Sequence, residues 1–478
     1  MKSKSHNFKK NALKALTDVT LQNALQKAKH GFINKRQLAL DALPEFEELR
    51  ANAYKIKEHT LKNLTGYLEQ FEQQVKNSGG QVHWASNAED AQNIIVKLCK
   101  DVDARSITKG KSMVGEEVSL NEALENAGFE TIETDLGEYI IQLAKEPPSH
   151  IIVPAVHKSQ QQIADLFKEH HKKYKFKSKL ETIPEIVDEA RKVLRSKFLQ
   201  ADVGITGANF LIAETGSTVI VTNEGNGDLT ASLPKTHIVI SSIEKVVPTL
   251  EDTSVLLRLL ARSATGQEVT SYTTFFNGPK RNTDLDGPES FHVVLVDNKR
   301  SEMLNGKFHD MLRCIHCGAC INHCPVYHTI GGHAYGWVYP GPMGSVLTPL
   351  MQGLEQGQHL PFASTFCGRC EEVCPMSIPL PQLLRQHRTQ IHKEKINSTR
   401  SRLGLYFWTL LTRHPRLYRL AINSSAMLLG LMGKKRGHIS WLPFASAWTN
   451  SRNLPAAQGQ SFISSWKKQQ RNKGNKNE

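Results

Sequence analysis

The spacing of apolar residues changes several times along the chain, and each change predicts a different kind of structure. In residues 1–77, apolar side chains such as Leu13, Leu16 and Leu21 recur every three to five positions, which is typical of amphipathic helices. From residue 78 to about 300, short apolar runs alternate with stretches of helical spacing. Such alternation is typical of an α/β domain with a largely parallel sheet. We therefore predict a helical N-terminal arm followed by an α/β domain.

Short apolar runs mark the strands that we expect in this α/β domain. They lie at 81–85, 130–134, 150–154, 216–222, 237–241 and 291–297. After the first run, Ser86 and Glu89 have the spacing of a capping box, so we expect a helix to begin there. Cys99 falls within this helix, and we interpret it as a small buried apolar residue.

The rest of the chain has a different pattern. Residues 301–384 are rich in Cys, Gly, Pro and aromatic residues, with a short helix predicted near 345–354. A helix is predicted at 383–396, across the start of region 385–478. Two apolar stretches follow it, at 403–411 and 420–432. Neither stretch reaches the roughly 18 residues that a membrane-spanning helix needs.

The C-terminal region is also strongly basic. Residues 385–478 contain 18 Lys and Arg against 2 acidic residues, whereas the whole chain has a formal charge of +14, so the first 384 residues carry about −2. Aromatic and Leu-rich helices flanked by Arg and Lys fit a membrane interface or a partner surface. We expect the polar end, from Trp466 onward, to be disordered. The predicted division of the chain is therefore 1–77, 78–300, 301–384 and 385–478.

The charge distribution and the N-terminal residues also indicate which partners the protein binds and in which compartment it resides. The chain contains no nucleic-acid-reading motif, so we expect no nucleic-acid partner, with a regulatory protein that uses its basic tail on DNA as the rival hypothesis. The N-terminal residues lack the apolar core of a secretion signal. We expect a cytoplasmic protein without a transmembrane span, and peripheral association with the inner membrane surface remains open.

Seven of the eight cysteines lie in two runs that end in Cys-Pro. The first run is Cys314-x2-Cys317-x2-Cys320-x3-Cys324-Pro325, and the second is Cys367-x2-Cys370-x3-Cys374-Pro375. This spacing is typical of ligands to four-iron clusters, with the Cys before Pro serving the other cluster. Zinc sites more often show paired Cys-x2-Cys units, and disulfides are uncommon in a chain without a secretion signal.

The second run is one cysteine short, because Ser364 stands where the first ligand of the run would be. If the runs cross-ligate, one cluster is held by Cys314, Cys317, Cys320 and Cys374, and the other by Cys324, Cys367 and Cys370. The second cluster would then be [3Fe-4S], or [4Fe-4S] with a non-Cys ligand such as Ser364 or an open iron. We interpret His316 and His323 as spacers within the first run.

The 42 residues between Cys324 and Cys367 are unusually many for a compact ferredoxin. Three large aromatics, Tyr335, Trp337 and Tyr339, lie within five residues of this insert. We expect the insert to shield the clusters from water, and His333 to have a packing role, with proton transfer or contact with a redox partner as the alternative.

Three Gly-bearing or charged loops of the α/β domain are candidates for ligand binding. Lys109-Gly110-Lys111-Ser112 ends like a phosphate loop, but Arg105 stands where that motif needs its first Gly. Residues 204–209 and 214–228 add further Gly-bearing loops. Because α/β folds bind ligands at the carboxyl ends of parallel strands, a small anion held by backbone amides and Lys109 or Lys111 is one hypothesis, and ordinary turn glycines are the other. The sequence assigns no catalytic residue.

Five features occur in a specific order: Lys109 to Met113, residues 133–138, 154–158 and 204–226, and the paired cysteine runs. This succession resembles the lactate-utilisation protein B family over nearly the whole chain. The resemblance implies a LUD-type α/β domain of the CoA-transferase and ribose-phosphate-isomerase kind, followed by an α-helical ferredoxin-like module. It also implies two four-iron clusters in an iron–sulfur subunit of a multi-protein system that oxidises L-lactate to pyruvate.

We therefore predict that the chain relays electrons through two clusters toward a respiratory acceptor, with a quinone or another membrane carrier as the candidate. Other subunits of the lactate oxidation system are the expected partners. The sequence contains no flavin or nicotinamide fingerprint, so oxidation of a hydroxy acid within the α/β domain itself remains an alternative.

Overall fold

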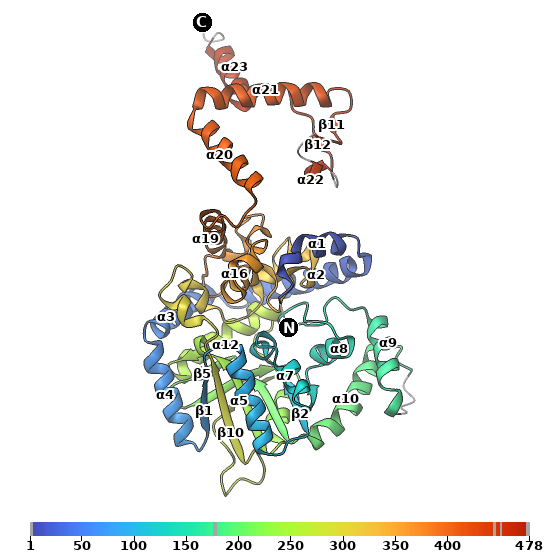
Figure 1. The fold of residues 1–478 in the computed structure, drawn as a ribbon, viewed down its shortest axis with the longest axis vertical. Helices are drawn as coiled ribbons and strands as arrows, with labels where there is room; N and C mark the ends of the chain where they lie inside the picture. Colours follow the sequence, from blue (N-terminus) through green and yellow to red (C-terminus); the bar gives the residue numbers. More distant parts are fainter. Residues whose placement is uncertain (1–2, 175–178, 443–445, 450–451, 475–478) are drawn as a thin grey trace. The chain divides into compact units, whose positions relative to one another are not determined.

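A six-stranded sheet forms the centre of the region predicted to be α/β (Figure 1). The structure is a computed structural model that describes residues 3–174, 179–442, 446–449 and 452–474. The strand order is β1-β10-β7-β4-β2-β3, and every neighbouring pair is parallel. The strands are β1 (Gln81–Ala85), β2 (Ser106–Gly110), β3 (Glu130–Glu133), β4 (Val203–Gly207), β7 (Thr236–Ser242) and β10 (Ser290–Val296). The predicted α/β fold with a largely parallel sheet is confirmed.

Helices cover both faces of this sheet, and alternate strand residues face opposite layers. Ile238 of β7 packs in a cluster that includes Ile95 of one helical layer, whereas its neighbour Val239 packs with Phe71 of the other. Cys99 is buried in the first of these clusters, as predicted, and burial raises the pKa of its thiol to about 12. The covering helices are α4 (Leu64–Asn77) on one face, and α5 (Ala88–Asp101), α6 (Met113–Glu117) and α7 (Leu120–Asn126) on the other.

A smaller sheet and further helices complete the α/β part. The second sheet has the order β8-β5-β6-β9 and comprises β5 (Phe210–Ile212), β6 (Ser217–Thr222), β8 (Val246–Val247) and β9 (Tyr272–Phe276). The other helical segments here are α8 (Leu136–Ala144), α9 (Gln160–His170), η2 (Lys172–Tyr174), α10 (Ile183–Gln200), α11 (Asn226–Ser232), η3 (Ile243–Lys245) and α12 (Leu250–Thr265).

Some local predictions for this part were wrong. Residues 150–154 form no strand, because the His150 ring accepts hydrogen bonds from the backbone N–H groups of Ile152 and Val153 and closes a turn. The cap of α5 is Asn87 rather than Ser86, and its side chain accepts the N–H of Asp90 at 3.0 Å. Lys109 and Gly110 end β2 and residues 204–207 belong to β4, although both stretches were interpreted as parts of glycine-bearing loops.

The N-terminal region is helical, as predicted, and it packs closely on the rest of the first unit. It contains η1 (Ser5–Asn7), α1 (Phe8–Leu16), α2 (Val19–Asp41), α3 (Phe46–Lys62) and α4. Helices α2 and α3 both contact α12. Leu25 of α2 and Ala53 of α3 are completely buried in the same cluster as the aromatic insert. These helices therefore belong to the hydrophobic core.

The cysteine-bearing region is built from short helices, which suits a chain whose direction must change at each cysteine. They are α13 (Arg300–Leu304), η4 (His309–Arg313), α14 (Ala319–Asn322), α15 (Tyr327–Ile330), η5 (His333–Tyr335), α16 (Gly341–Gln352), α17 (Leu354–Gly357), η6 (Leu360–Phe362), α18 (Arg369–Glu372) and α19 (Leu380–Lys393). Helix α16 begins four residues before the predicted start, where Pro342 occupies the first turn. Tyr335, Trp337 and Tyr339 are buried, as expected for a shielding insert.

Contacts separate the chain into two units, Met1–Lys393 and Glu394–Glu478. The second unit contains α20 (Thr399–Arg413), α21 (Pro415–Gly433), β11 (His438–Ile439), α22 (Ser446–Thr449), β12 (Leu454–Pro455) and α23 (Phe462–Gly474). Helix α23 covers most of the segment expected to be disordered, and residues 475–478 lie outside the described residues. Among the described residues, no helix combines the length and apolar character required to cross a bilayer. The four-part division of the chain stays a prediction.

A glycine in β4 allows a close approach between layers. A Cβ on Gly204 would collide with the backbone carbonyl of Thr230 in α11. We expect Gly204→Ala to lower the free energy of unfolding by about 1–3 kcal/mol, the usual cost of overpacking. Urea unfolding followed by circular dichroism measures this change.

Gly31 in α2 provides the matched control, because a Cβ there meets nothing within 4 Å. Gly31→Ala should stabilise the chain by roughly 0.5–1 kcal/mol through helix propensity alone. Equal effects of the two substitutions would contradict the proposed close contact.

Candidate functional site: two cysteine cavities and an adjoining pocket

Four cysteines from both runs line one cavity of the first unit. Cys314, Cys317 and Cys320 come from the first run and Cys374 from the second. Most of the other lining side chains are apolar, including Met311, Ile315, Met343 and Ile378. Burial, followed by the neighbouring Cys374 thiol, raises the pKa of Cys317 to about 12. Such thiols give up their protons only when a positive centre compensates the thiolates, as a metal cluster does.

The remaining three cysteines of the runs line a second cavity. Cys324 of the first run lies here with Cys367 and Cys370 of the second, and Ser364 lines the same space. Burial, followed by the Cys324 and Cys367 thiols, raises the pKa of Cys370 to about 12. The Ser364 hydroxyl accepts the N–H of Phe366 at 3.1 Å, so it also has the turn role that a serine often has.

The runs therefore exchange one cysteine each between the cavities, which we call the first cage (Cys314, Cys317, Cys320, Cys374) and the second cage (Cys324, Cys367, Cys370). This grouping is the one expected from the sequence, although ligation itself stays a prediction. None of the eight cysteines, all of which lie among the described residues, forms a disulfide. The donor set fits an iron–sulfur cluster because several buried thiols converge on one apolar space in each case.

Arginines of the N-terminal helices donate hydrogen bonds to the backbone of the loop that carries Cys374. Arg36 of α2 donates to the carbonyl of Val373 at 3.0 Å, and Arg50 of α3 donates to that of Cys374 at 2.9 Å. Nothing in the sequence pattern pointed to these contacts, because they join residues more than 300 positions apart. The helical arm thus positions a cysteine of the first cage.

A buried ionic network joins the α/β part to the first cage. Arg300 lies between Glu117 of α6, at 2.8 Å, and Glu244 of η3, at 2.7 Å. Tyr339 of the aromatic insert donates to Glu117 at 2.6 Å. All four side chains are almost inaccessible to solvent. Burial is the largest influence on each ion, but the paired charges prevail: the pKa of Arg300 is raised, and that of Glu244 is lowered to about 2.

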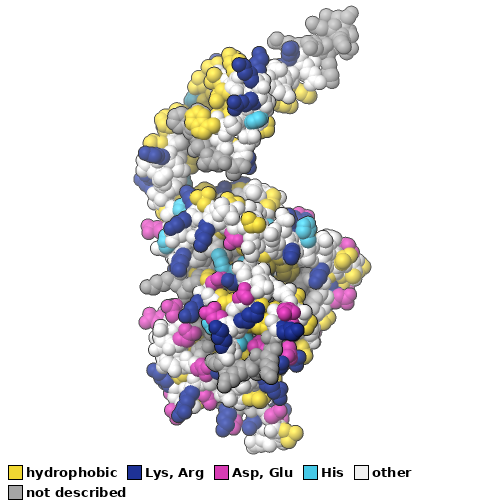
Figure 2. Space-filling view, turned by 90° about the vertical axis from the view of Figure 1, so that its right-hand side faces the viewer, with side chains coloured by type: hydrophobic (Ala, Val, Ile, Leu, Met, Phe, Trp, Pro, Cys, Tyr) yellow, Lys and Arg dark blue, Asp and Glu magenta, His cyan; other side chains and the backbone are white. Residues whose placement is uncertain are grey.

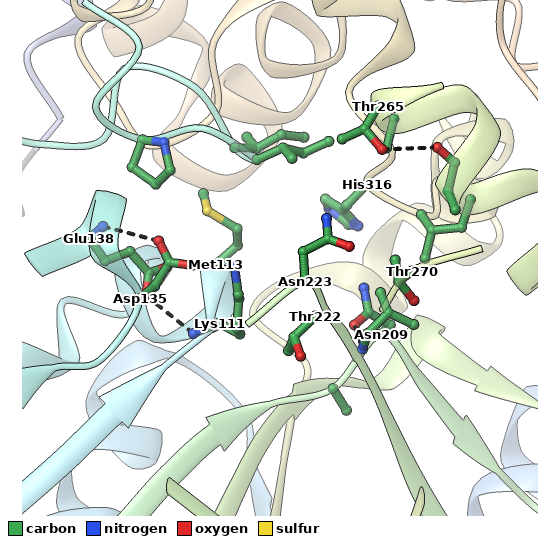
Figure 3. Close-up of a pocket in the computed structure, with 18 of the residues that line it drawn as sticks. Lys111, Met113, Asp135, Glu138, Asn209, Thr222, Asn223, Thr265, Thr270 and His316 are labelled. Carbon is green, nitrogen blue, oxygen red and sulfur yellow. Dashed lines mark hydrogen bonds and ion pairs between the residues drawn. The ribbon is translucent and has the colours of Figure 1, made fainter. Parts of the chain in front are cut away.

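A pocket of about 160 Å³ lies at the carboxyl ends of β2 and β4. Figure 3 shows Lys111, Asp135 and Glu138 on one side of this space and Asn209, Asn223 and His316 on the other. Lys111 forms an ion pair with Asp135. Burial, followed by the charges of Glu133 and Asp135, raises the pKa of Glu138 well above its ordinary value.

Lysines in and near this pocket have different roles. Lys109 does not line it, because its ammonium group is fully buried between Glu116, at 2.9 Å, and Glu133, at 2.8 Å. The hypothesis that Lys109 holds an anion was therefore wrong, whereas Lys111 does line the pocket. Lys245 also lines it and was missed, since it ends η3 and belongs to no recognisable motif.

Two histidines singled out in the sequence have defined surroundings. The His333 ring packs against His157, with ring centroids 4.4 Å apart, and its Nε2 lies 2.8 Å from the carbonyl of Pro147, in keeping with the predicted packing role. His316 was interpreted as a spacer, yet it lines both the first cage and the pocket. Its left-handed backbone conformation, with φ of 55°, accompanies the tight turn between Cys314 and Cys317.

Comparison with known proteins supports the two-part organisation. Residues 68–296 match the LUD domain, and residues 310–378 match a 4Fe-4S dicluster domain. The chain is 43% identical to Lactate utilization protein B of Shouchella clausii over 97% of both chains. It is 42% identical to Lactate utilization protein B of Bacillus velezensis and 40% identical to the uncharacterized electron transport protein YkgF of Escherichia coli, over 98% of the chains in each case.

The Arg300 network yields a stability prediction. Arg300→Met leaves the buried carboxylates of Glu117 and Glu244 without their cation, so we expect a loss of about 3–5 kcal/mol in the free energy of unfolding. Urea unfolding of the anaerobically prepared chain, followed by tryptophan fluorescence, measures it. Arg258→Met is the control because its ion pair with Glu45 is about half exposed, so its loss should change the free energy of unfolding much less. Similar losses in the two variants would contradict the assigned importance of Arg300.

Proposed function

The chain belongs to the lactate utilization protein B family, and from this membership and its two cages we propose that it is an iron–sulfur electron-transfer subunit of a multi-protein system oxidising L-lactate to pyruvate. The observation that carries the proposal is the partition of seven cysteines into two cavities, with Cys324 and Cys374 exchanged between the runs. Bound iron–sulfur clusters supply one-electron redox chemistry. The other subunits of the system are the proposed partners.

We propose that Cys314, Cys317, Cys320 and Cys374 hold a [4Fe-4S] cluster, and that Cys324, Cys367 and Cys370 hold the second. Ser364 stands at the position where a fourth Cys would be expected, and its hydroxyl lines the second cage beside that of Thr365. A [4Fe-4S] cluster with a non-Cys ligand or an open iron, and a [3Fe-4S] cluster, are the forms compatible with this donor set.

The protein's own contributions are ligation, exclusion of water and hydrogen bonds to sulfur. The N–H of His316 donates to Cys314 Sγ at 3.4 Å, and the N–H of Tyr327 donates to Cys324 Sγ at 3.5 Å. Such bonds stabilise negative charge on a ligand and tune reduction potential. Buried Tyr335 and Trp337 from the insert restrict water around the cysteine-bearing region.

Cluster ligation can be tested with single cysteine variants of the full-length chain, isolated anaerobically. We expect Cys314→Ala and Cys374→Ala to remove the same electron paramagnetic resonance signal, because both residues line the first cage. Cys324→Ala and Cys370→Ala should remove the other signal. Each variant should lose roughly half of the iron.

Cys99→Ala is the matched control, since this thiol is buried in α5 among apolar side chains. It should leave both signals unchanged. Separate signals lost in Cys314→Ala and Cys374→Ala would refute the crossed assignment. Absence of iron and acid-labile sulfide from the unmodified protein would refute the proposed function as a whole.

We further propose that the second unit associates with the inner membrane surface, where a quinone or another membrane carrier accepts the electrons. Its helix α20 has no buried residue, and Tyr406, Phe407 and Trp408 are each more than half exposed. Figure 2 shows hydrophobic side chains beside Lys and Arg on the second unit, in the upper part of the view. Aromatic residues with flanking cations bind the interface of anionic bilayers.

Membrane association is measured by co-sedimentation with vesicles. We expect binding to phosphatidylglycerol vesicles, little binding to phosphatidylcholine vesicles, and loss of binding in a Phe407→Ser, Trp408→Ser double variant. Trp84→Ser is the control, because Trp84 is a comparably exposed tryptophan of β1 in the first unit. Salt-sensitive binding of DNA without binding of anionic vesicles would instead favour the regulatory alternative.

A further inference from the structure

The pocket beside the first cage has the size and chemistry of a ligand site. Its volume of about 160 Å³ is below the roughly 300–1,000 Å³ typical of pockets for drug-sized molecules, so it suits a ligand of few atoms. It lies where α/β folds place their ligands, at the carboxyl ends of parallel strands. The LUD-type part and the cysteine-bearing part both supply its walls, through Lys111 on one side and His316 and Tyr339 on the other.

We infer that this pocket binds a small 2-hydroxy or 2-oxo carboxylic acid. The inference deepens the proposed function and rests on it, since it places the substrate class on this chain beside the first cage. Besides the carboxylates of Glu138 and of Asp135, which pairs with Lys111, the lining contains cationic, amide and apolar groups. The last three are the kinds of surface that such an acid requires.

Lysine and amide groups can receive the carboxylate and the neighbouring oxygen. The Lys245 ammonium group donates to the carbonyl of Ala208 at 2.6 Å, which uses one of its three donors. The Asn209 side chain accepts the N–H of Val221 at 3.0 Å through its oxygen, so its amide nitrogen keeps its donors. Both side chains line the pocket and are held in place by these bonds.

His316 supplies a second, independent indication of a ligand. Both of its ring nitrogens are shielded from solvent, and neither has a hydrogen-bond partner among the described residues. A buried polar group without a partner costs about 1–3 kcal/mol, and the pocket is one of the two spaces that His316 lines, so a ligand with a hydrogen-bonding oxygen there would supply a partner. Because His316 also lines the first cage, a ligand bonded to this ring lies next to that cage.

The apolar walls match the short carbon chain of the acid. Met113, Ile151, Ile152 and Leu260 line the pocket together with the small residues Ala261 and Ala264. A methyl group buried there leaves water favourably. The two alanines come from α12, and their single methyl groups leave the pocket space that a larger side chain would fill.

The test uses full-length protein with its clusters, under anaerobic conditions, and three probes: L-lactate, pyruvate and propionate. Calorimetry should show saturable binding of L-lactate or pyruvate, and propionate, which lacks the second oxygen, should bind about tenfold or more weakly. Binding should alter the paramagnetic resonance signal that depends on Cys314 and leave the signal that depends on Cys324 unchanged.

Two variants test the pocket by different means. Lys245→Met removes the cation, and Ala264→Leu fills the space without removing a charge; each should weaken binding about tenfold or more. Retained iron content shows that a variant has folded. If Lys245→Met does not fold, the binding measured for Ala264→Leu decides the test. Lys158→Met is the control, since Lys158 lines a different cavity with Glu146 and His333, and it should bind as the unmodified chain does.

The outcomes separate this inference from the proposed function. Protein that contains both clusters but binds neither L-lactate nor pyruvate overturns the inference and leaves the electron-transfer proposal intact. Equal binding by the folded Ala264→Leu variant and the unmodified chain also overturns it. Protein without iron or acid-labile sulfide refutes the proposed function itself.

Discussion

The ion pairs of Arg300 with Glu117 and Glu244 hold together parts of the chain that the sequence keeps far apart. Glu117 ends α6 beside β2, Glu244 follows β7, and Arg300 begins the chain segment that leads to the cysteines. These three ions have almost no solvent contact, so their positions relative to one another must stay fixed. A displaced partner would leave a buried charge uncompensated. The hydrogen bond from Tyr339 extends the same constraint to the aromatic insert. The first cage and the adjoining pocket are thus tied to the edge of the sheet.

The N-terminal helices also position the cages, through hydrogen bonds and apolar contacts. Their arginines hold the carbonyls of Val373 and Cys374, while their apolar faces share one core with the aromatic insert. Fastening the loop by its backbone leaves the cysteine side chains to face the cavity. The same segment of chain therefore contributes to both stability and the geometry of the cage. This explains why helices that begin the sequence are packed beside cysteines near residue 370.

Local signals in the sequence predicted much of this organisation, and contacts distant in sequence account for what was missed. The spacing of the cysteines predicted how they group, because ligands a few residues apart must bend around a common centre. The apolar runs predicted β1, β7 and β10, whereas β4 was missed because Gly204 and Gly207 look like turn residues until the layers packed against them are known. Segment 150–154 looked like a strand, but the His150 ring takes its backbone N–H groups. Lys245 and the Arg300 network had no local pattern at all.

The two cages differ in their access to the surroundings. Cys367 of the second cage is exposed, whereas the cysteines of the first cage are buried or only partly accessible. Under the proposed function, a redox partner can therefore approach the second cage more closely than the first. Dioxygen has the same access, so a cluster held by the second cage should decay first in air, and one held by the first cage should outlast it.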